Sequence, residues 1–217
     1  RYRMEADEVL ACAGMAAAFG FGTVVLQGGE DYGLSTDWVA ELIMKIKRET
    51  GLAVTLSLGE RPGHELRAWR EAGADRYLLR FETSDRHLYG RIHPSLPSRN
   101  SDRIELIREL GALGYETGSG VMVGIPGQTY QSLADDILLF RALDLDMIGI
   151  GPYIPNPLTP MGNGRWESGI RPRQQVPNSA SMASKVVALA RLLCPEANIP
   201  ATTALATLDT ISGYELG

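Results

Sequence analysis

The chain has 217 residues, 44% of them hydrophobic and 22% charged, and its formal net charge is −5. This length and composition predict a single globular domain over residues 1–217 with a sizeable core. The acidic balance leaves no basic surface for nucleic acid, and no apolar run reaches the roughly 18 residues of a membrane-spanning helix.

Short apolar segments of strand length alternate with amphipathic helical segments along the chain. In chain order, the pattern predicts a helix over 5–19, a strand over 23–27, a helix over 36–50, a strand over 52–58, a helix over 63–72 and a strand over 76–80. It continues with a helix over 99–113, a strand over 116–123, a helix over 129–143, a strand over 146–150, a Pro/Gly-rich loop over 152–177, a helix over 179–193 and a strand over 199–204. This alternation predicts parallel strands with right-handed crossovers.

Six parallel strands fit either a doubly wound sheet or part of a β/α barrel. A dinucleotide-binding sheet requires G-x-G-x-x-G after an early strand, and "GSGVMVG" at 118–124 neither has that spacing nor opens a helix. The sequence therefore favours an α/β fold of the TIM-type (β/α) barrel. Because a full barrel needs about 250 residues, and the chain starts at Arg1 without methionine and stops at "SGYELG", we expect the barrel to be incomplete at both ends.

Polar residues and glycines gather where the expected strands end. In a β/α barrel the active site lies at the carboxyl ends of the strands. These ends carry Gln27 to Glu30, Ser57 to Glu60, Arg80 to Thr83, Gly124 to Gln128, Gly151 to Tyr153, and Thr202 with Thr203. Clusters of this kind at most strand ends predict a ligand site on this rim.

Residues that could catalyse difficult chemistry alone are missing from these strand ends. The three lysines fall on expected helices, which excludes a Schiff-base aldolase, and the three histidines fall in helical or loop segments. Cys12 and Cys194 also fall in helical segments, where buried free thiols of the cytoplasm are favoured over a disulfide or a shared metal site. The groups that remain bind charged, polyhydroxylated ligands, so we expect a cofactor to carry the reaction.

Several candidates also have a purely structural interpretation. Glu30 and Asp31 fit a solvated turn, and Glu60 beside Arg61 fits a surface ion pair. At the other strand ends, the structural interpretations are an ion pair between Arg80 and Glu82, ordinary strand hydroxyls at Thr202 and Thr203, and a core filler at Met147. The functional interpretation rests on all of these residues falling on one rim.

One family combines these segments in this order. They are "RYRM", "VVLQGGED", "VTLSLGE", "RYLLRFET", "GYETGSGVMVGIPGQT", "DMIGIGPYIPNPLTP" and "NIPATTA". Together they resemble the HydE-type FeFe-hydrogenase maturases, which are radical S-adenosylmethionine (SAM) enzymes related to biotin synthase and methylornithine synthase. The resemblance covers nearly the whole chain except an insertion around residues 165–177. It implies a (β/α) barrel of the radical SAM kind.

The resemblance also implies which residues bind SAM. Gly28, Gly29 and Glu30 match the segment that binds the amino group of its methionine moiety. Glu82 matches the residue that holds the ribose, and Arg103 the partner of the SAM carboxylate, a contact suited to guanidinium. Ser57 would lie beside the cofactor, with Tyr153 and Ile154 near the adenine.

A second set of residues matches the cavity that binds the substrate in this family. The set comprises Gln27, Thr55, Arg80, Met147, Thr202 and Thr203. The implied substrate is an organometallic iron precursor that carries cysteine, carbon monoxide and cyanide. The implied reaction is reductive cleavage of SAM to a 5′-deoxyadenosyl radical, which acts on this precursor during maturation of the hydrogenase H-cluster. The implied protein partners are other hydrogenase maturases and a reductant protein.

The chain departs from the family in one respect. The C-x-x-x-C-x-x-C motif that ligates the [4Fe–4S] cluster is absent, and its position in the family precedes the segment matching "RYRM". We therefore expect the cluster ligands upstream of Arg1, no metal ligand within this chain, and no activity of this chain alone. Two alternatives stay open: a radical SAM mutase of the methylornithine-synthase type, and a clusterless scaffold that binds SAM or an anion.

Overall fold

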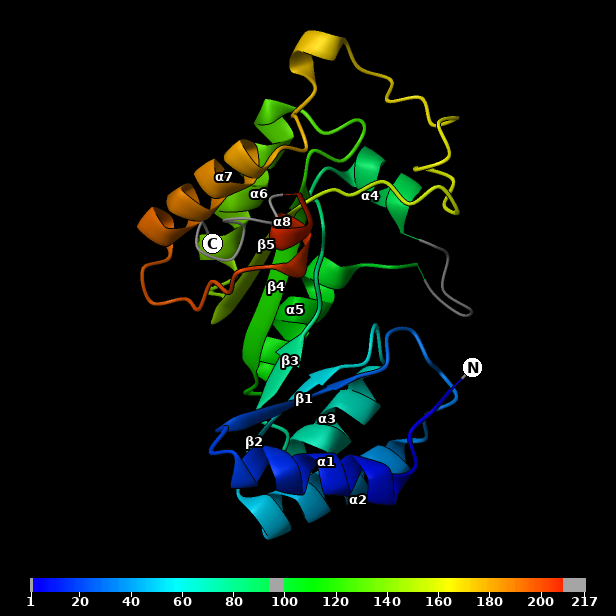
Figure 1. Ribbon diagram of the computed structural model, residues 1–217, viewed down its shortest axis with the longest axis vertical. Helices are drawn as coiled ribbons and strands as arrows, with labels where there is room; N and C mark the ends of the chain where they lie inside the picture. The colour runs from blue at the N-terminus through cyan, green and yellow to red at the C-terminus, as the bar shows by residue number, and fades with distance from the viewer. Residues whose placement is uncertain (1, 94–99, 209–217) are drawn as a thin grey trace. The chain divides into compact units, whose positions relative to one another are not determined.

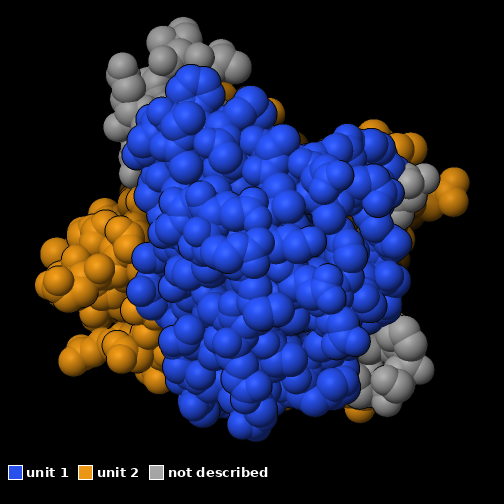
Figure 2. Space-filling view, turned by 90° about the horizontal axis from the view of Figure 1, so that it is seen from below, with its two compact units in different colours: residues 1–79, 105–117 blue, residues 80–104, 118–217 orange. Residues whose placement is uncertain are grey.

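A computed structural model describes residues 2–93 and 100–208 of the chain (Figure 1). The chain divides into two compact units, coloured separately in Figure 2. Unit 1 comprises residues 1–79 and 105–117, and unit 2 comprises residues 80–104 and 118–217. Each unit is a βα assembly with its own parallel strands.

Unit 1 holds three parallel strands with helices packed on one of their faces (Figure 1). Its elements are α1 (Ala6–Ala18), β1 (Thr23–Gln27), α2 (Thr36–Thr50), β2 (Ala53–Ser57), α3 (Gly63–Glu71), β3 (Arg76–Leu78) and most of α5 (Arg103–Ala112). Strand β1 pairs with β2 from Thr23 opposite Ala53 to Gln27 opposite Ser57. The buried core lies between these strands and the helices, and includes Val54, Leu56 and Trp69.

Helix α2 shows how local sequence sets an element. The hydroxyl of Ser35 accepts a hydrogen bond from the backbone N–H of Trp38 and so caps the first turn. Gly51 ends the helix in the left-handed region, with φ 69°, which a residue without Cβ adopts at little cost. Between these ends, Val39, Leu42, Ile43 and Ile46 recur at helical spacing and are buried against the strands.

Unit 2 holds the remaining strands and helices. They are α4 (Arg86–Ile92), β4 (Glu116–Val123, from residue 118 on), α6 (Tyr130–Ala142), β5 (Met147–Pro152), the short 3₁₀ helix η1 (Pro172–Gln174), α7 (Ala180–Leu193) and α8 (Thr203–Leu208). Strand β4 pairs in parallel with β5, from Gly118 opposite Met147 to Val123 opposite Pro152. A Cβ at position 120 would overlap the carbonyl oxygen of Gly149, so glycine there permits this strand spacing.

Most predicted elements are confirmed, but three predictions are wrong. The expected last strand over 199–204 is not a strand: Asn198 makes an isolated bridge to Met147, and helix α8 begins at Thr203. The described residues therefore hold five strands rather than six. The third strand ends at Leu78, and the helix expected from residue 99 begins at Arg103, although residue 99 itself lies outside the described part. Helix α4 was not predicted.

The two cysteines are free thiols, as expected, but Cys12 is exposed on α1 and Cys194 is half-buried at the end of α7. The prediction that both are buried is therefore wrong. None of the helices in the described ranges combines the length and the apolar character needed to cross a membrane.

Candidate functional site

The carboxyl ends of β1 and β2 bring three predicted residues onto one face of unit 1. Gln27 lies opposite Ser57, and Val25 lies opposite Thr55 in the parallel register. Because side chains alternate along a strand, Gln27, Thr55 and Ser57 share the face away from the apolar core. Thr55 is buried at 5% exposure, and Ser57 is half-buried. The structure therefore places these three polar side chains on one face of unit 1.

The loop after β1 holds Glu30 in a defined position. The carboxylate of Glu30 accepts hydrogen bonds from the Tyr32 hydroxyl (2.8 Å) and from the backbone N–H of Glu60 (3.0 Å). The neighbouring Asp31 makes a bidentate ion pair with Arg3, with Nη2–O distances of 2.9 Å. The loop is thus not a solvated turn, because both carboxylates are engaged by the protein.

Arg61 holds the loop after β1 through hydrogen bonds to its backbone. Its side chain is 2% exposed, and it donates to the carbonyl oxygens of Asp31 (2.9 Å) and Leu34 (2.8 Å) and to Glu65 Oε2 (2.5 Å). Its guanidinium also lies 5.2 Å from the ring centroid of Trp69. The predicted surface ion pair with Glu60 is therefore wrong: both residues are buried, and Arg61 binds backbone carbonyls and Glu65 instead. Its fork geometry suits this bidentate role.

Gly59 makes room for the Glu30 carboxylate. It adopts a φ of +76°, and a Cβ at this position would overlap the Glu30 side chain. We expect Gly59→Ala to destabilise the protein by about 1–3 kcal/mol, from backbone strain and displacement of Glu30. Gly51→Ala is the matched control, because Gly51 has a similar φ of +69° and open space around it. Urea unfolding of both variants would test this, and equal losses would show that contact with Glu30 does not matter.

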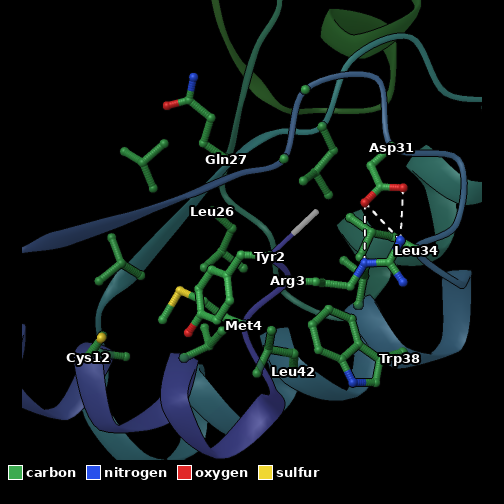
Figure 3. A pocket seen from close by; sticks show the side chains of 18 residues that line it. Tyr2, Arg3, Met4, Cys12, Leu26, Gln27, Asp31, Leu34, Trp38 and Leu42 are labelled. Atoms are coloured by element: carbon green, nitrogen blue, oxygen red, sulfur yellow. Dashed lines mark hydrogen bonds and ion pairs between the residues drawn. The ribbon is translucent and has the colours of Figure 1, made fainter.

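A cavity of about 740 Å³ in unit 1 is lined by residues of α1, α2 and β1 (Figure 3). Tyr2, Met4 and Cys12 lie on one side of it, and Trp38 and Leu42 of α2 line another part. In Figure 3 the amide of Gln27 points away from these side chains. The cavity is therefore largely apolar, and it is also lined by Gln27 and by two of the predicted SAM-binding residues, Gly28 and Gly29.

In unit 2, three charged residues converge beyond the end of β3. Arg80 Nε lies 3.3 Å from Glu82 Oε1, and Arg80 Nη2 donates to the carbonyl oxygen of Val121 at 2.6 Å. Arg103, at the start of α5, donates from Nη1 to the Arg80 carbonyl oxygen at 2.8 Å. Glu82 has a φ of 65°, in the left-handed region, and pairs with Val121 in an isolated parallel bridge. The predicted ion pair of Arg80 and Glu82 is present.

Three buried polar atoms of unit 2 have no hydrogen bond in the described structure. Arg80 Nε, Glu82 Oε2 and the Tyr153 hydroxyl are buried and have no hydrogen-bond partner among the described residues. Burial raises the pKa of Glu82, although Arg80, Arg103 and the Met122 backbone N–H oppose the change. Orphaned buried polar atoms are costly in a folded protein. They indicate that a polar ligand completes these contacts.

The remaining predicted residues of unit 2 divide into two groups. Met147, Gly149 and Gly151 share one face of β5, where a Cβ at 149 would lie 4.0 Å from Arg80 Nε and one at 151 would lie 2.8 Å from Thr202 Oγ1. Thr202 donates to the carbonyl oxygen of Ile150 at 3.1 Å. The structure thus brings Met147, Arg80 and Thr202 to one face. In contrast, Thr203 and Ile154 are exposed, in α8 and in the loop after β5.

The sequence analysis missed Asp136, a fully buried residue of α6. Its Oδ1 accepts hydrogen bonds from the backbone N–H (2.5 Å) and the hydroxyl (2.6 Å) of Ser84, and its Oδ2 lies 3.4 Å from Gln128 Nε2. Burial raises its pKa to about 6. The signal in the sequence was an acid at a core position of an amphipathic helix, between Leu133 and Phe140.

The raised pKa of Asp136 predicts a pH-dependent contribution to stability. The folded protein binds this proton more tightly than the unfolded chain, whose value is near 3.8. The stability linked to it is therefore fully present below pH 3.8 and is lost as the pH rises through about 6. We expect wild-type protein to lose on the order of 3 kcal/mol relative to Asp136→Asn across this range. Urea unfolding of both proteins at several pH values tests this, and a pH-independent difference would contradict it.

The insertion in the long loop is anchored at two points in unit 2. The indole N–H of Trp166 donates to the Pro126 carbonyl oxygen at 3.1 Å, and the Arg91 guanidinium lies 4.1 Å from the Trp166 ring centroid. Gln175 accepts a hydrogen bond from the Gly127 N–H at 2.8 Å and donates to the Ile125 carbonyl oxygen at 3.0 Å. These contacts fasten the insertion to the turn at 124–128.

Among the residues that the structure describes, no three Cys, His, Asp or Glu side chains are placed to hold a metal ion. With only two cysteines in the chain, the residues present do not fit an iron–sulfur cluster held by three thiolates.

Known proteins share both the sequence and the fold of this chain. A family model described as the Radical SAM superfamily matches residues 1–140. The [FeFe] hydrogenase maturase subunit HydE of Thermotoga maritima is 45% identical over 96% of this chain and 56% of its own length. The 3-methylornithine synthase of Methanosarcina acetivorans is 28% identical over 96% of this chain and 56% of its own length. A crystal structure of methylornithine synthase matches with a TM-score of 0.79 and 26% identity, over 100% of this chain and 60% of that one.

These matches confirm the expected fold class. The parallel strands of each unit and the similarity to methylornithine synthase are those of a radical SAM (β/α) barrel, of which this chain covers a part. The chain spans about 56% of the length of the two curated relatives named above.

Proposed function

The chain belongs to the radical SAM superfamily, and from this we propose that the full-length protein is a radical SAM enzyme of FeFe-hydrogenase maturation. The observation that carries the proposal is the 45% identity to HydE over 96% of the chain. In the proposed reaction, SAM is cleaved reductively to a 5′-deoxyadenosyl radical, which acts on an organometallic iron precursor. The proposed partners are the other hydrogenase maturases and a reductant protein.

Two groups of residues are proposed to bind SAM, and the contacts within each unit support them. In unit 1, Gly28, Gly29 and Glu30 would bind the amino group, supported by the fixed position of the Glu30 carboxylate. In unit 2, Glu82 would bind the ribose and Arg103 the carboxylate. The orphaned Glu82 Oε2 and Tyr153 hydroxyl fit the hydroxyl-rich and aromatic parts of this cofactor. Ser57, Tyr153 and Ile154 are proposed as further contacts, although Ile154 is exposed.

The proposed substrate contacts are supported by polarity and position. Arg80 supplies a half-buried guanidinium with an orphaned Nε, which suits an anionic ligand. Gln27 and Thr55 share one face of unit 1, and Met147 and Thr202 share one face of unit 2. Thr203 is the weakest of the set, because it is exposed at the start of a helix.

The cluster ligands are proposed to come from residues outside this chain, since this chain does not supply three thiolates. When bound, a [4Fe–4S] cluster supplies the electron that cleaves SAM. The residues described here would bind and orient SAM and keep the substrate in place. The cytoplasmic location and the reductant protein stay predictions.

A second candidate function is a radical SAM mutase, favoured by the structural match to methylornithine synthase. The higher identity to HydE favours the maturase. A clusterless scaffold is the third candidate, and the orphaned polar atoms of unit 2 would suit its ligand equally well.

The deciding experiment is anaerobic iron–sulfur reconstitution of the full-length protein, followed by electron paramagnetic resonance with and without SAM. We expect a reduced [4Fe–4S] signal that changes when SAM is added, and 5′-deoxyadenosine among the products under reducing conditions. Formation of 3-methylornithine would favour the mutase. SAM binding without any cluster signal would favour the scaffold and would contradict the radical SAM proposal.

A further inference from the structure

Glu82 occupies a backbone conformation that it does not favour on its own. Its φ of 65° lies in the left-handed region, which costs a residue with a Cβ about 1–3 kcal/mol. Such a conformation persists only when the surrounding structure enforces it. The backbone N–H of Glu82 donates to the Gly120 carbonyl oxygen at 3.0 Å, which fixes one side of the residue.

Asp136 fixes the other side, two residues further along. Both donors of Ser84, the backbone N–H and the hydroxyl, are bonded to Asp136 Oδ1 at 2.5 and 2.6 Å. Between Glu82 and Ser84, Thr83 is fully buried, and after them Asp85 caps helix α4. The segment 82–85 is therefore held between the bridge to β4, the carboxylate on α6 and the start of α4.

A carboxylate is a costly residue at this position. Asp136 is 0% exposed, and no ion pair of its side chain is found in the ranges that the structure describes. Burying a charge without a cation costs free energy that an apolar side chain would avoid. Stability alone therefore does not explain an aspartate here, whereas two strong bonds to one turn do explain it, because a carboxylate can accept both at once.

We propose that Asp136 is a positioning residue that holds Ser84, and through it the left-handed Glu82, so that the Glu82 carboxylate is oriented to bind the ribose of SAM. This inference rests on the proposed binding of SAM by the full-length protein. Gln128 Nε2 lies near the other oxygen of Asp136 and donates to the Met122 carbonyl oxygen at 3.1 Å, which links the same carboxylate to the turn after β4.

The test compares Asp136→Asn with Asp135→Asn in the reconstituted full-length protein. Both substitutions remove one charge from α6, but Asp135 is exposed. Affinity for SAM is measured by anaerobic calorimetry, amide exchange is followed in peptides that cover 81–88, and unfolding is followed by circular dichroism. We expect Asp136→Asn to weaken SAM binding by about tenfold, because the amide oxygen can still accept from Ser84 but lacks the negative charge that strengthens both bonds. Amide hydrogen exchange at residues 82–85 of Asp136→Asn should be faster than in the wild type. At saturating SAM, the electron paramagnetic resonance signal of the variant's cluster should have the wild-type shape.

Two further results make the inference falsifiable. Ser84→Ala removes the hydroxyl donor and keeps the backbone N–H, so we expect a smaller loss of SAM affinity, about threefold. This variant also provides the test of the positioning role if Asp136→Asn does not fold. Wild-type affinity in Asp136→Asn and Ser84→Ala would overturn the positioning role. Absence of SAM binding in the wild type would instead overturn the proposed function, and this inference with it.

Discussion

Replacing Glu82 by alanine is expected to weaken SAM binding by the full-length protein between about tenfold and a hundredfold, the value of one hydrogen bond to a buried charge. The physical reason is that Glu82 Oε2 is buried without a hydrogen-bond partner in the described structure, while Oε1 lies beside Arg80. The Glu82 carboxylate is desolvated by burial, and the Glu82 backbone has an unfavourable left-handed φ.

Glu196→Ala is the matched control for this prediction, because Glu196 is an exposed glutamate of the same unit. Affinity is measured by anaerobic calorimetry on reconstituted protein, with unfolding followed in parallel. Because Glu82→Ala also leaves Arg80 without its carboxylate, the unfolding measurement separates a loss of stability from a loss of binding. Unchanged SAM affinity in Glu82→Ala would remove Glu82 from the binding site, and equal losses in both variants would indicate a non-specific effect of charge.

Arg61→Met is expected to destabilise the protein by about 3–5 kcal/mol, as when one partner of a buried ion pair is removed. The methionine side chain is similar in length, but it leaves Glu65 without its cation and removes the guanidinium donors to the carbonyl oxygens of Asp31 and Leu34. Because Arg61 holds the loop that follows β1, the remaining folded protein should also bind SAM more weakly.

Urea unfolding monitored by circular dichroism measures the loss, and Arg67→Met provides the control from an exposed position of α3. The double variant Arg61→Met with Glu65→Gln should recover part of the stability, because it removes the uncompensated carboxylate. A loss no larger than that of Arg67→Met would show that the buried network around Arg61 is dispensable.

Local sequence was sufficient to place most helices and strands. Apolar residues at helical spacing, with Ser35 before and Gly51 after them, predict α2 because capping and burial act within a few residues. Strand alternation likewise places Thr55 and Ser57 on one face, whereas Gln27 joins them only through the pairing of β1 with β2. The family follows from the sequence as well, since its motifs are continuous segments.

Tertiary structure decided the points that depend on residues far apart in the chain. Arg61 beside Glu60 predicts a surface pair, but the carbonyl oxygens that bind its guanidinium come from the loop at 31–34. The left-handed Glu82 and the buried Asp136 are invisible in a local pattern, because a bridge to β4 and a contact across more than fifty positions enforce them. The expected last strand failed for the same reason: a segment becomes a strand only when it makes a continuous row of hydrogen bonds with a neighbouring strand. In the described structure β5 has such a row with β4, but on this segment's side it makes one isolated bridge, from Met147 to Asn198.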